Sequence, residues 1–386
     1  MLLSYSIYLL IFNGLMLSAL FLLDNSMNLI LVSALPGLML LPLIIRDQIV
    51  NRHKIVSYII IIIFVNLFIF NSILHEKFFS IINVIQFYII PLLIYPIFIN
   101  LSEYKPERAF KALTVSTVII TLWGFLQFVG RDVIPWQLLS IPNTAGLAAF
   151  NRVVLGDVTV IRPNFSLGSS MVCAYFFNIM YLFMKFRHRS SAWWFLGEMM
   201  FFLALFLTFS RVGIVLHIFN FFTSQLLLRR YKSTLFISSI SLFIVFYYFN
   251  NYLFYTLGRF STLLTGQDRS LMAHNEDYIA ALNMLSEFPL GIPVGLAGAI
   301  ITDGAIFHIL LETSILGLLF IIYPCICVFR FYHNTTVTDK AVFVLLCTNI
   351  SLHSVFNSGL LTNFNIIVSM LLVLSVARYG ISIWQR

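Results

Sequence analysis

The sequence is short of charged residues. Only 10% of its 386 residues are Asp, Glu, Lys or Arg, whereas soluble domains carry about 25%. Hydrophobic residues make up 60% of the chain, and its mean hydropathy is +0.96. A buried core does not account for a charge deficit of this size. The composition therefore excludes an ordinary soluble domain and indicates a membrane protein.

Cysteine is scarce as well, with four residues in the chain. They lie in apolar stretches, without a CxxC pair or a nearby His cluster: Cys173, Cys325, Cys327 and Cys347. Such cysteines are typical of small buried side chains, not of disulfide partners or metal ligands. Carboxylate-rich metal motifs are missing too, so the sequence predicts no metal site and no cofactor.

Long hydrophobic runs are what the chain has in abundance. A helix that crosses the bilayer core needs about 20 apolar residues. Twelve candidate spans meet this need: about 3–23, 27–45, 55–74, 79–101, 112–129, 168–184, 193–209, 212–228, 233–251, 304–328, 341–358 and 364–379. The first run lacks a basic start and a cleavage site, so it is a span, not a signal peptide. We expect an all-α integral membrane fold of about 12 transmembrane helices, forming one polytopic domain over residues 1–386.

Basic residues concentrate in alternate connections between these spans. One set of connections holds 16 of the 23 Lys and Arg residues: Arg46, Arg52, Lys54, Lys105, Arg108, Lys111, Lys185, Arg187, Arg189, Arg229, Arg230, Lys232, Arg330, Lys340, Arg378 and Arg386. Basic loops stay on the cytoplasmic side, which places both termini in the cytoplasm. The net charge of +8 is then mostly a topology signal, and nucleic-acid binding is not inferred from it.

Two outward connections are long, at about 130–167 and 252–303. The first contains a predicted hairpin at Val153–Val160, with Gly156 and Asp157 as its turn. The second contains a predicted amphipathic helix at about 276–287, which we expect to lie flat on the membrane. Its apolar positions are Tyr278, Ile279, Leu282 and Leu285. Long outer loops favour an enzyme over a transporter, because a substrate at the outer surface needs structure there.

Arginine dominates the outward basic residues, six of the seven. Its planar fork of donors fits phosphate bidentately. Arg211 stands out, because it lies in Thr208–Gly213 between two spans, with almost no loop and no acidic neighbour in sequence. A charge placed there is costly unless it meets a cavity or a partner. We expect an anion contact, with a structural ion pair as the alternative.

Several polar side chains lie inside spans near their outer ends: His308 and Glu312, His353 and Asn357, and His217. The first two pairs have i, i+4 spacing, so each pair shares a helix face. Their clustering suggests one polar cavity that opens outward, and helix–helix hydrogen bonds are the alternative. Glu198 lies near the inner end of its span without such company.

Asp303 stands where the second long connection enters the tenth span. A carboxylate there is a candidate general base for a sugar hydroxyl. Asp is also a good N-terminal helix cap, and both interpretations remain open.

Three stretches resemble the O-antigen polymerase and O-antigen ligase superfamily: Arg162–Gly168, Leu207–Arg211, and a third that runs from Ala280 through Pro289-Leu290-Gly291 and Asp303-Gly304 to Gly317. The resemblance implies a metal-independent membrane glycosyltransferase in the bacterial inner membrane, with its site facing the periplasm. It implies that arginines bind the lipid pyrophosphate, here Arg211, Arg162 and Arg269. Many relatives have an Arg where this chain has His274, so Arg269 or His274 fills that role.

The resemblance also implies partners: a polyprenyl-pyrophosphate-linked glycan as donor and as acceptor, membrane lipids, and a chain-length-regulating co-polymerase. Ligases of the superfamily resemble one another in a His at the position of Asp303, and this chain lacks it. His308 is five residues further on, about 140° away around the helix. We therefore expect a polymerase, with Asp303, His308 and Glu312 as catalytic candidates. A ligase or a flippase of lipid-linked sugar is the alternative.

Overall fold

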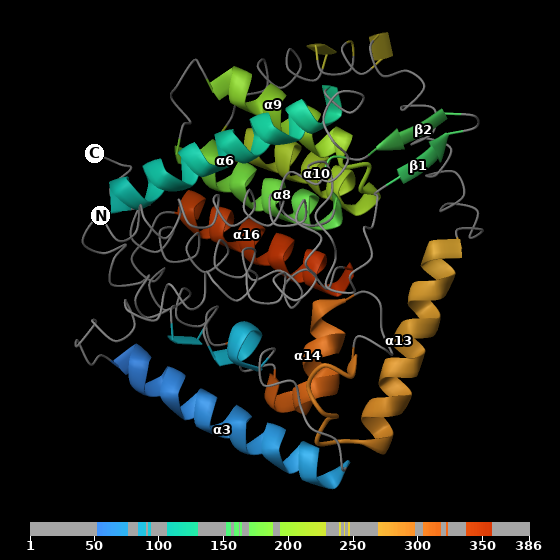
Figure 1. Ribbon diagram of the computed structural model, residues 1–386. Helices are drawn as coiled ribbons and strands as arrows, with labels where there is room; N and C mark the ends of the chain where they lie inside the picture. The colour runs from blue at the N-terminus through green and yellow to red at the C-terminus, as the bar shows by residue number, and fades with distance from the viewer. Residues whose placement is uncertain are drawn as a thin grey trace, which may run out of the picture.

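The structure is a computed structural model, and it describes residues 52–75, 84–89, 92–93, 106–129, 152–155, 158–161, 163, 170–187, 194–228, 239–240, 243, 246–247, 269–297, 304–317, 322 and 337–356. This part of the chain is helical apart from one two-stranded hairpin. Figure 1 shows its helices gathered around α8, with α3, α13 and α14 on one side of the group. The predicted spans at 3–23, 27–45 and 364–379 lie outside the described residues.

Helices lie in six of the predicted spans: α3 Arg52–Leu74, α6 Pro106–Val129, α8 Ser170–Arg187, α9 Trp194–Leu207, α10 Arg211–Leu228 and α16 Val337–Phe356. In α6, Pro106 takes the first helical position, where its missing N–H costs nothing. Of the span at 79–101, the structure describes mainly the π-helix η1, Val84–Ile89. The helical nature of these spans is confirmed.

The predicted continuous span at 304–328 is interrupted. Helix α14, Ala305–Thr313, gives way to the short 3₁₀-helix η3, Ser314–Gly317. Ser314 has a φ of 57°, in the left-handed region that side chains rarely adopt. Its hydroxyl donates to the carbonyl oxygen of Pro289. The break is therefore tied to a contact with the preceding loop.

Both structured elements predicted in the long connections are present. Strands β1 (Arg152–Leu155) and β2 (Val158–Ile161) pair antiparallel, with Leu155 opposite Val158, so the register leaves Gly156 and Asp157 to connect them. Helix α13 runs from Arg269 to Glu287, starting seven residues before its predicted beginning at about 276. The hairpin and the amphipathic helix are thus confirmed as elements.

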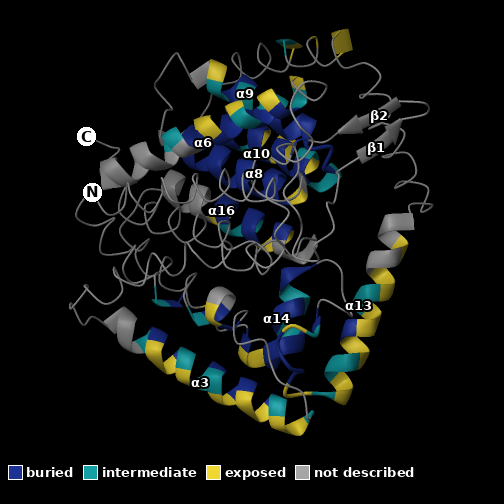
Figure 2. Cartoon of the chain, in the orientation of Figure 1, coloured by how far each residue is buried: buried dark blue, intermediate teal, exposed yellow. Residues whose placement is uncertain are grey.

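Helix α8 forms the centre of the fold. Every residue from Val172 to Lys185 is buried, and α8 packs directly against α9, α10 and α16. Figure 2 shows this burial continuing into the facing sides of α10 and α16. A helix that is apolar all round is expected at such a central position. The few polar side chains of α8 must therefore find their partners inside the protein.

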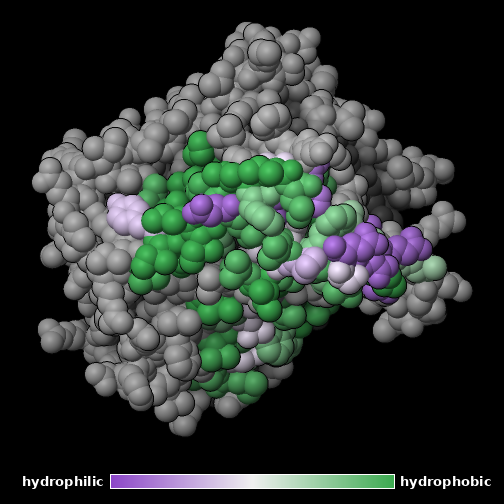
Figure 3. All heavy atoms as spheres, turned by 90° about the horizontal axis from the view of Figure 1, so that it is seen from below, coloured by the Kyte–Doolittle hydropathy of each residue, from purple (hydrophilic) through white to green (hydrophobic). Residues whose placement is uncertain are grey.

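Three outer helices bury several polar side chains and expose many large apolar ones. In α10, His217, Asn220, Ser224 and Gln225 are buried, while Val215, Ile218, Phe219, Phe222 and Leu226 are exposed. In α6, Thr117, Thr121 and Gln127 are buried, while Val118, Ile119, Leu122, Leu126 and Val129 are exposed. In α3, Ser57 and Asn71 are buried, while Ile59, Ile62, Ile69, Phe70 and Ile73 are exposed. Figure 3, which views the molecule from the side where α3 lies, shows a broad hydrophobic surface there.

One segment of α3 passes a simple length and hydropathy test for a membrane span. Within the described residues, Val56–Leu74 is the stretch long and apolar enough to cross a bilayer. Its exposed Asn66 donates its side-chain amide to the carbonyl oxygen of Ile62, at 2.8 Å. The side-chain amide of Asn66, which lies on this apolar surface, is thus hydrogen-bonded to the backbone of its own helix.

Candidate functional site

The turn between α9 and α10 places Arg211. Helix α9 ends at Leu207, and the hydroxyl of Thr208 donates to the carbonyl oxygen of Leu205 at 2.6 Å. The hydroxyl of Ser210 accepts the N–H of Gly213 at 3.2 Å, which makes Ser210 the N-cap of α10. Arg211 is then the first residue of α10 and half-buried. Two side-chain oxygens close the two helix ends, so this turn needs no further loop.

A buried network of amides joins α8, α10 and α16. The side-chain amide of Asn178 donates to the carbonyl oxygen of Gly213 at 2.9 Å and lies 3.3 Å from Nε2 of His353. Asn220 donates to Oδ1 of Asn178 at 3.3 Å and exchanges two 2.7 Å hydrogen bonds with Asn349. Buried amides that are satisfied in this way specify how helices pack. The network therefore fixes the start of α10, and Arg211 with it, against α8 and α16.

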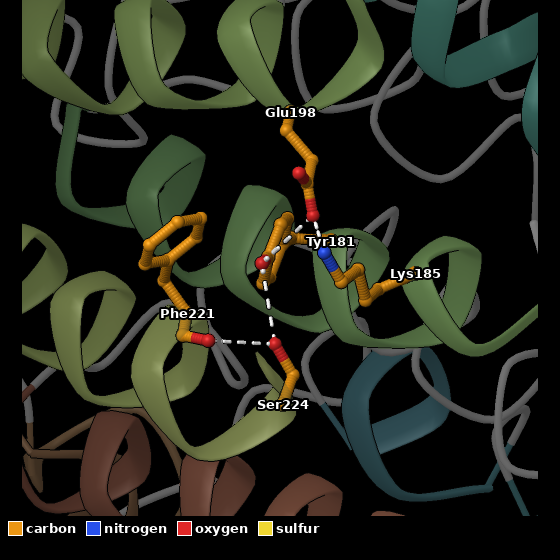
Figure 4. Close-up of polar contacts among 5 residues, drawn as sticks. All are labelled: Tyr181, Lys185, Glu198, Phe221 and Ser224. Carbon is orange, nitrogen blue, oxygen red and sulfur yellow. Dashed lines mark hydrogen bonds and ion pairs between the residues drawn. The ribbon is translucent and has the colours of Figure 1, made fainter. Parts of the chain in front are cut away.

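A second buried network lies further along α8 (Figure 4). The ammonium of Lys185 pairs with the carboxylate of Glu198 on α9, and both side chains are almost fully buried. The hydroxyl of Tyr181 lies 3.5 Å from Oε1 of Glu198 and 3.3 Å from the hydroxyl of Ser224 on α10. His217 is buried against the Tyr181 ring, with ring centroids 4.6 Å apart.

These contacts correct two expectations. The prediction that Glu198 lacks polar company is wrong, because Lys185 and Tyr181 contact it. Lys185 was counted among the loop charges, but it lies buried within α8. Its long aliphatic stem allows the ammonium to reach Glu198 from an apolar helix. One basic residue of the charge pattern therefore belongs to the interior of the bundle.

Glu312 is the centre of a third cluster. Its carboxylate accepts the hydroxyl of Tyr88 on η1 at 2.6 Å and the N–H of Gly295 at 2.8 Å. Tyr88 is itself buried, edge-on to Phe64 of α3 with ring centroids 5.9 Å apart. His308 lies one turn before Glu312 on α14 and is also buried. The structure thus brings His308 and Glu312 together on one buried helix, as the i, i+4 spacing predicts.

The predicted site residues differ in how far the structure describes them. Arg269 and His274 belong to α13, but their side chains lie outside the described residues, as do Arg162, Asp303 and Asn357 altogether. The N-cap position of α14 is taken by Gly304, with a φ of 100°. Asp303 therefore precedes the cap position, and the interpretation of Asp303 as the N-cap residue is not supported.

The polar groups expected to share one outward-opening cavity fall into separate networks. His353 belongs with Asn178, His217 packs on Tyr181, and Glu312 belongs with Tyr88. All four side chains of His217, His308, Glu312 and His353 are buried. The described contacts thus show three buried clusters instead of one lined cavity. Among the described residues, no group of three or more His, Cys, Asp or Glu side chains is placed to hold a metal ion.

Sequence reasoning missed the uncharged partners of these groups: Asn71, Tyr88, Asn178, Asn220 and Asn349. Each is a polar side chain within an apolar run, and that signal was present in the sequence. An amide in an apolar helix needs a partner just as a charge does.

Comparison with known proteins adds no relative to this geometry. No known family model matches the chain, and neither a curated protein nor a solved structure matches it.

Proposed function

We propose that the chain is an integral membrane glycosyltransferase with about 12 transmembrane helices. It polymerises polyprenyl-pyrophosphate-linked oligosaccharide repeat units into O-antigen at the periplasmic face of a bacterial inner membrane. The proposal rests on the sequence motifs around Arg162, Arg211 and Asp303–Gly317. Structural support comes from the inverted polarity of the outer helices and the grouping of loop elements at one end of the bundle.

The inverted polarity of α3, α6 and α10 is the observation that carries the membrane assignment. Their exposed faces hold large aliphatic and aromatic side chains, and their hydroxyl, amide and imidazole groups are buried beside apolar residues such as Phe64, Ile120 and Leu216. Water would disfavour such a surface, since soluble monomers rarely expose contiguous apolar patches above a few hundred Å². Lipid tails favour it, and they force polar groups to find partners inside the bundle.

The ends of several helices gather where the loop elements lie. Gly213 near the start of α10 contacts Asn178 of α8, and Asn178 contacts His353 near the end of α16. Asn71 near the end of α3 contacts Leu290 and Glu312. Figure 1 shows the β1–β2 hairpin and α13 on this same side of the bundle. In the predicted topology this is the periplasmic end of the bundle, and α14 packs there against α13 of the second long connection.

Glycosyl transfer at this end would depend on stabilising the negative charge that grows on the leaving pyrophosphate. An acceptor sugar hydroxyl attacks the anomeric carbon of the donor, the bond from that carbon to the phosphate oxygen breaks, and its electron pair leaves with the pyrophosphate. Arg211, with Arg162, Arg269 or His274, stabilises the growing negative charge. Asp303 or His308 accepts the proton of the hydroxyl. Glu312 lies directly behind His308 on α14.

Purified protein in lipid vesicles, incubated with a defined lipid-linked repeat unit, tests this function. We expect a ladder of products that differ by one repeat, and no ladder with Arg211→Ala protein. Transfer to a lipid A core acceptor instead would identify a ligase. Movement of the lipid-linked sugar across the vesicle membrane without a ladder would identify a flippase, and either result would overturn the proposal.

Orientation has its own test. Single cysteines at Pro142 and Thr265, in the two long connections, should react with a membrane-impermeant reagent added from outside. Cysteines at Glu107 and His188 should react only after the membrane is opened. The reverse pattern would place the proposed site on the cytoplasmic side and exclude it.

A further inference from the structure

Both carboxylate oxygens of Glu312 accept hydrogen bonds from the protein. One oxygen accepts the hydroxyl of Tyr88 and the other accepts the backbone N–H of Gly295. The Glu312 side chain is only 6% exposed. Its two donors come from separate segments, η1 and the loop after α13. Glu312 thus joins α14 to the loop that precedes it and to η1, whose Tyr88 is 224 residues away in sequence.

The same loop is held from its other side by α3. The side-chain amide of Asn71 donates to the carbonyl oxygen of Leu290 at 2.9 Å and reaches that of Glu312 at 3.5 Å. His75 approaches the carbonyl oxygen of Gly291 at 3.4 Å and packs its ring against Phe288 at 4.7 Å. The loop therefore lies between the end of α3 and α14, with contacts to both.

Backbone atoms of this loop lie in close contact with backbone atoms of α14. The N–H of Ile292 donates to the carbonyl oxygen of Leu311 at 2.7 Å. A Cβ on Gly291, whose φ is 93°, would lie 2.9 Å from that same carbonyl oxygen. Glycine is needed there for both its conformation and its size. The loop is thus pressed onto the last turn of α14, directly beside Glu312.

Two attachments then fix α13 against α14. Tyr278 of α13 stacks on Phe307 of α14 with ring centroids 4.5 Å apart, and Ala281 packs with Leu311 in one small apolar core. The loop held by Glu312 is the second attachment, because it follows α13 directly. Since α13 carries Arg269 and His274 and α14 carries His308, the two attachments set the separation of these groups.

We propose that Glu312 is a positioning residue, and that with Tyr88 and Asn71 it holds the loop Pro289–Gly295 and so aligns α13 with α14. This inference rests on the proposed function for its catalytic consequence, but the alignment itself does not depend on any substrate. A general base must be oriented toward the proton it removes. Both carboxylate oxygens of Glu312 are instead oriented toward protein donors, the hydroxyl of Tyr88 and the N–H of Gly295.

Distances between spin labels test the alignment without substrate. The labels are placed on Ile69 of α3 and Leu282 of α13, which are 44% and 57% exposed, in a variant whose four cysteines are replaced. Glu312→Ala should broaden or shift the distance distribution. Glu312→Gln should keep it narrow, because the amide oxygen still accepts the Gly295 N–H. An unchanged distribution in Glu312→Ala would overturn the proposal.

Turnover of the same variants in vesicles separates positioning from catalysis. A misplacement of about 1 Å costs on the order of 100-fold in rate, so Glu312→Ala should lose about that much kcat/KM per folded molecule. Glu312→Gln should stay within about tenfold of the parent, whereas loss of a general base costs about 100-fold to 10,000-fold. A loss above 100-fold in Glu312→Gln with an unchanged distance distribution would show catalysis instead of positioning.

Two further variants complete the design. Glu287→Gln makes the same chemical change at an exposed glutamate at the end of α13, and it should alter neither distances nor turnover. Tyr88→Phe removes one hydroxyl only, so it tests the alignment if Glu312→Ala does not fold, and its distance distribution should broaden. If the parent protein forms no polymer, the proposed function fails while the distance measurements still decide the role of Glu312.

Discussion

Lys185 and Glu198 form a buried ion pair between the last turn of α8 and the first turns of α9 (Figure 4). Both side chains are almost completely removed from solvent, at 1% and 3% exposure. Tyr181 and Ser224 add polar contacts around the pair. The ion pair thus joins two neighbouring helices near the segment that connects them. Either charge alone would be unfavourable in its buried position.

Removing one charge should therefore be more harmful than removing both. Loss of a single partner leaves the other buried without compensation, and such changes cost about 3–5 kcal/mol. We expect Lys185→Met and Glu198→Leu each to lower the thermal midpoint in detergent sharply, and the double variant to recover most of the loss. If the loss in the double variant equals the sum of the losses in the two single variants, the two charges act independently and the prediction is wrong.

Close packing of α8 on α10 leads to the second prediction. A Cβ on Gly213 would overlap the Cβ of Ala174, and overpacking of this kind costs about 1–3 kcal/mol. Gly213→Ala should destabilise the protein and also lower turnover, because Arg211 lies two residues earlier. Adding Ala174→Gly should restore both, as it returns the space. Thermal unfolding and ladder formation measure the two effects, and a Gly213→Ala protein equal to its parent would contradict the packing.

Local elements were predictable from the sequence because their causes are local. Helices such as α6 and α10 follow from apolar runs of span length, and the hairpin follows from Gly156-Asp157 between two β-branched stretches. The i, i+4 relation of His308 and Glu312 needed only helix geometry. These features depend on a few neighbouring residues.

Partners distant in sequence were not predictable in the same way. Tyr88 and Glu312 are 224 residues apart, and no periodicity relates them. The break of the tenth span at Ser314 depends on a hydrogen bond to Pro289 in another segment. Lys185 looked like a loop charge because it ends an apolar run, and its burial depends on Glu198 being present on α9. Tertiary contacts decide each of these cases.

Arg211 supplies the third prediction. Its place at the first turn of α10 is fixed by the Ser210 cap, so substitution should change the contact it makes more than the fold. Arg211→Lys keeps the charge but loses the planar fork that fits phosphate. We expect at least a tenfold loss of polymerising activity at normal expression, since bidentate contacts to a charged group are worth about 1.5–3 kcal/mol each. Arg230→Lys, in an expected cytoplasmic connection, is the matched control and should be silent.

Helix α13 presents three different sides. Tyr278, Ala281 and Leu285 face α14 and its loop. Ile279 and Leu282 are each more than half exposed. A third side carries the exposed acidic residues Glu276 and Glu287, about 120–140° around the helix from Leu282. The first side suits contact with protein, the second suits contact with lipid, and the third suits contact with water.

Labelling of single sites on α13 therefore gives the last prediction. An interfacial helix buries its apolar side about 5–10 Å into the headgroup and acyl boundary. An environment-sensitive fluorophore at Leu282 should shift to shorter wavelength in vesicles and be quenched by lipids that carry a spin label in the upper acyl chain. The same fluorophore at Glu276 or Glu287 should show neither effect and should be quenched by a water-soluble reagent. Because all three sites lie on one helix, differences in label chemistry or protein folding cannot produce the contrast. Lipid quenching that is equal at Leu282 and Glu276 would mean that α13 is immersed on both sides. Quenching at neither site would mean that α13 stands clear of the membrane, so that its exposed apolar residues would not contact lipid.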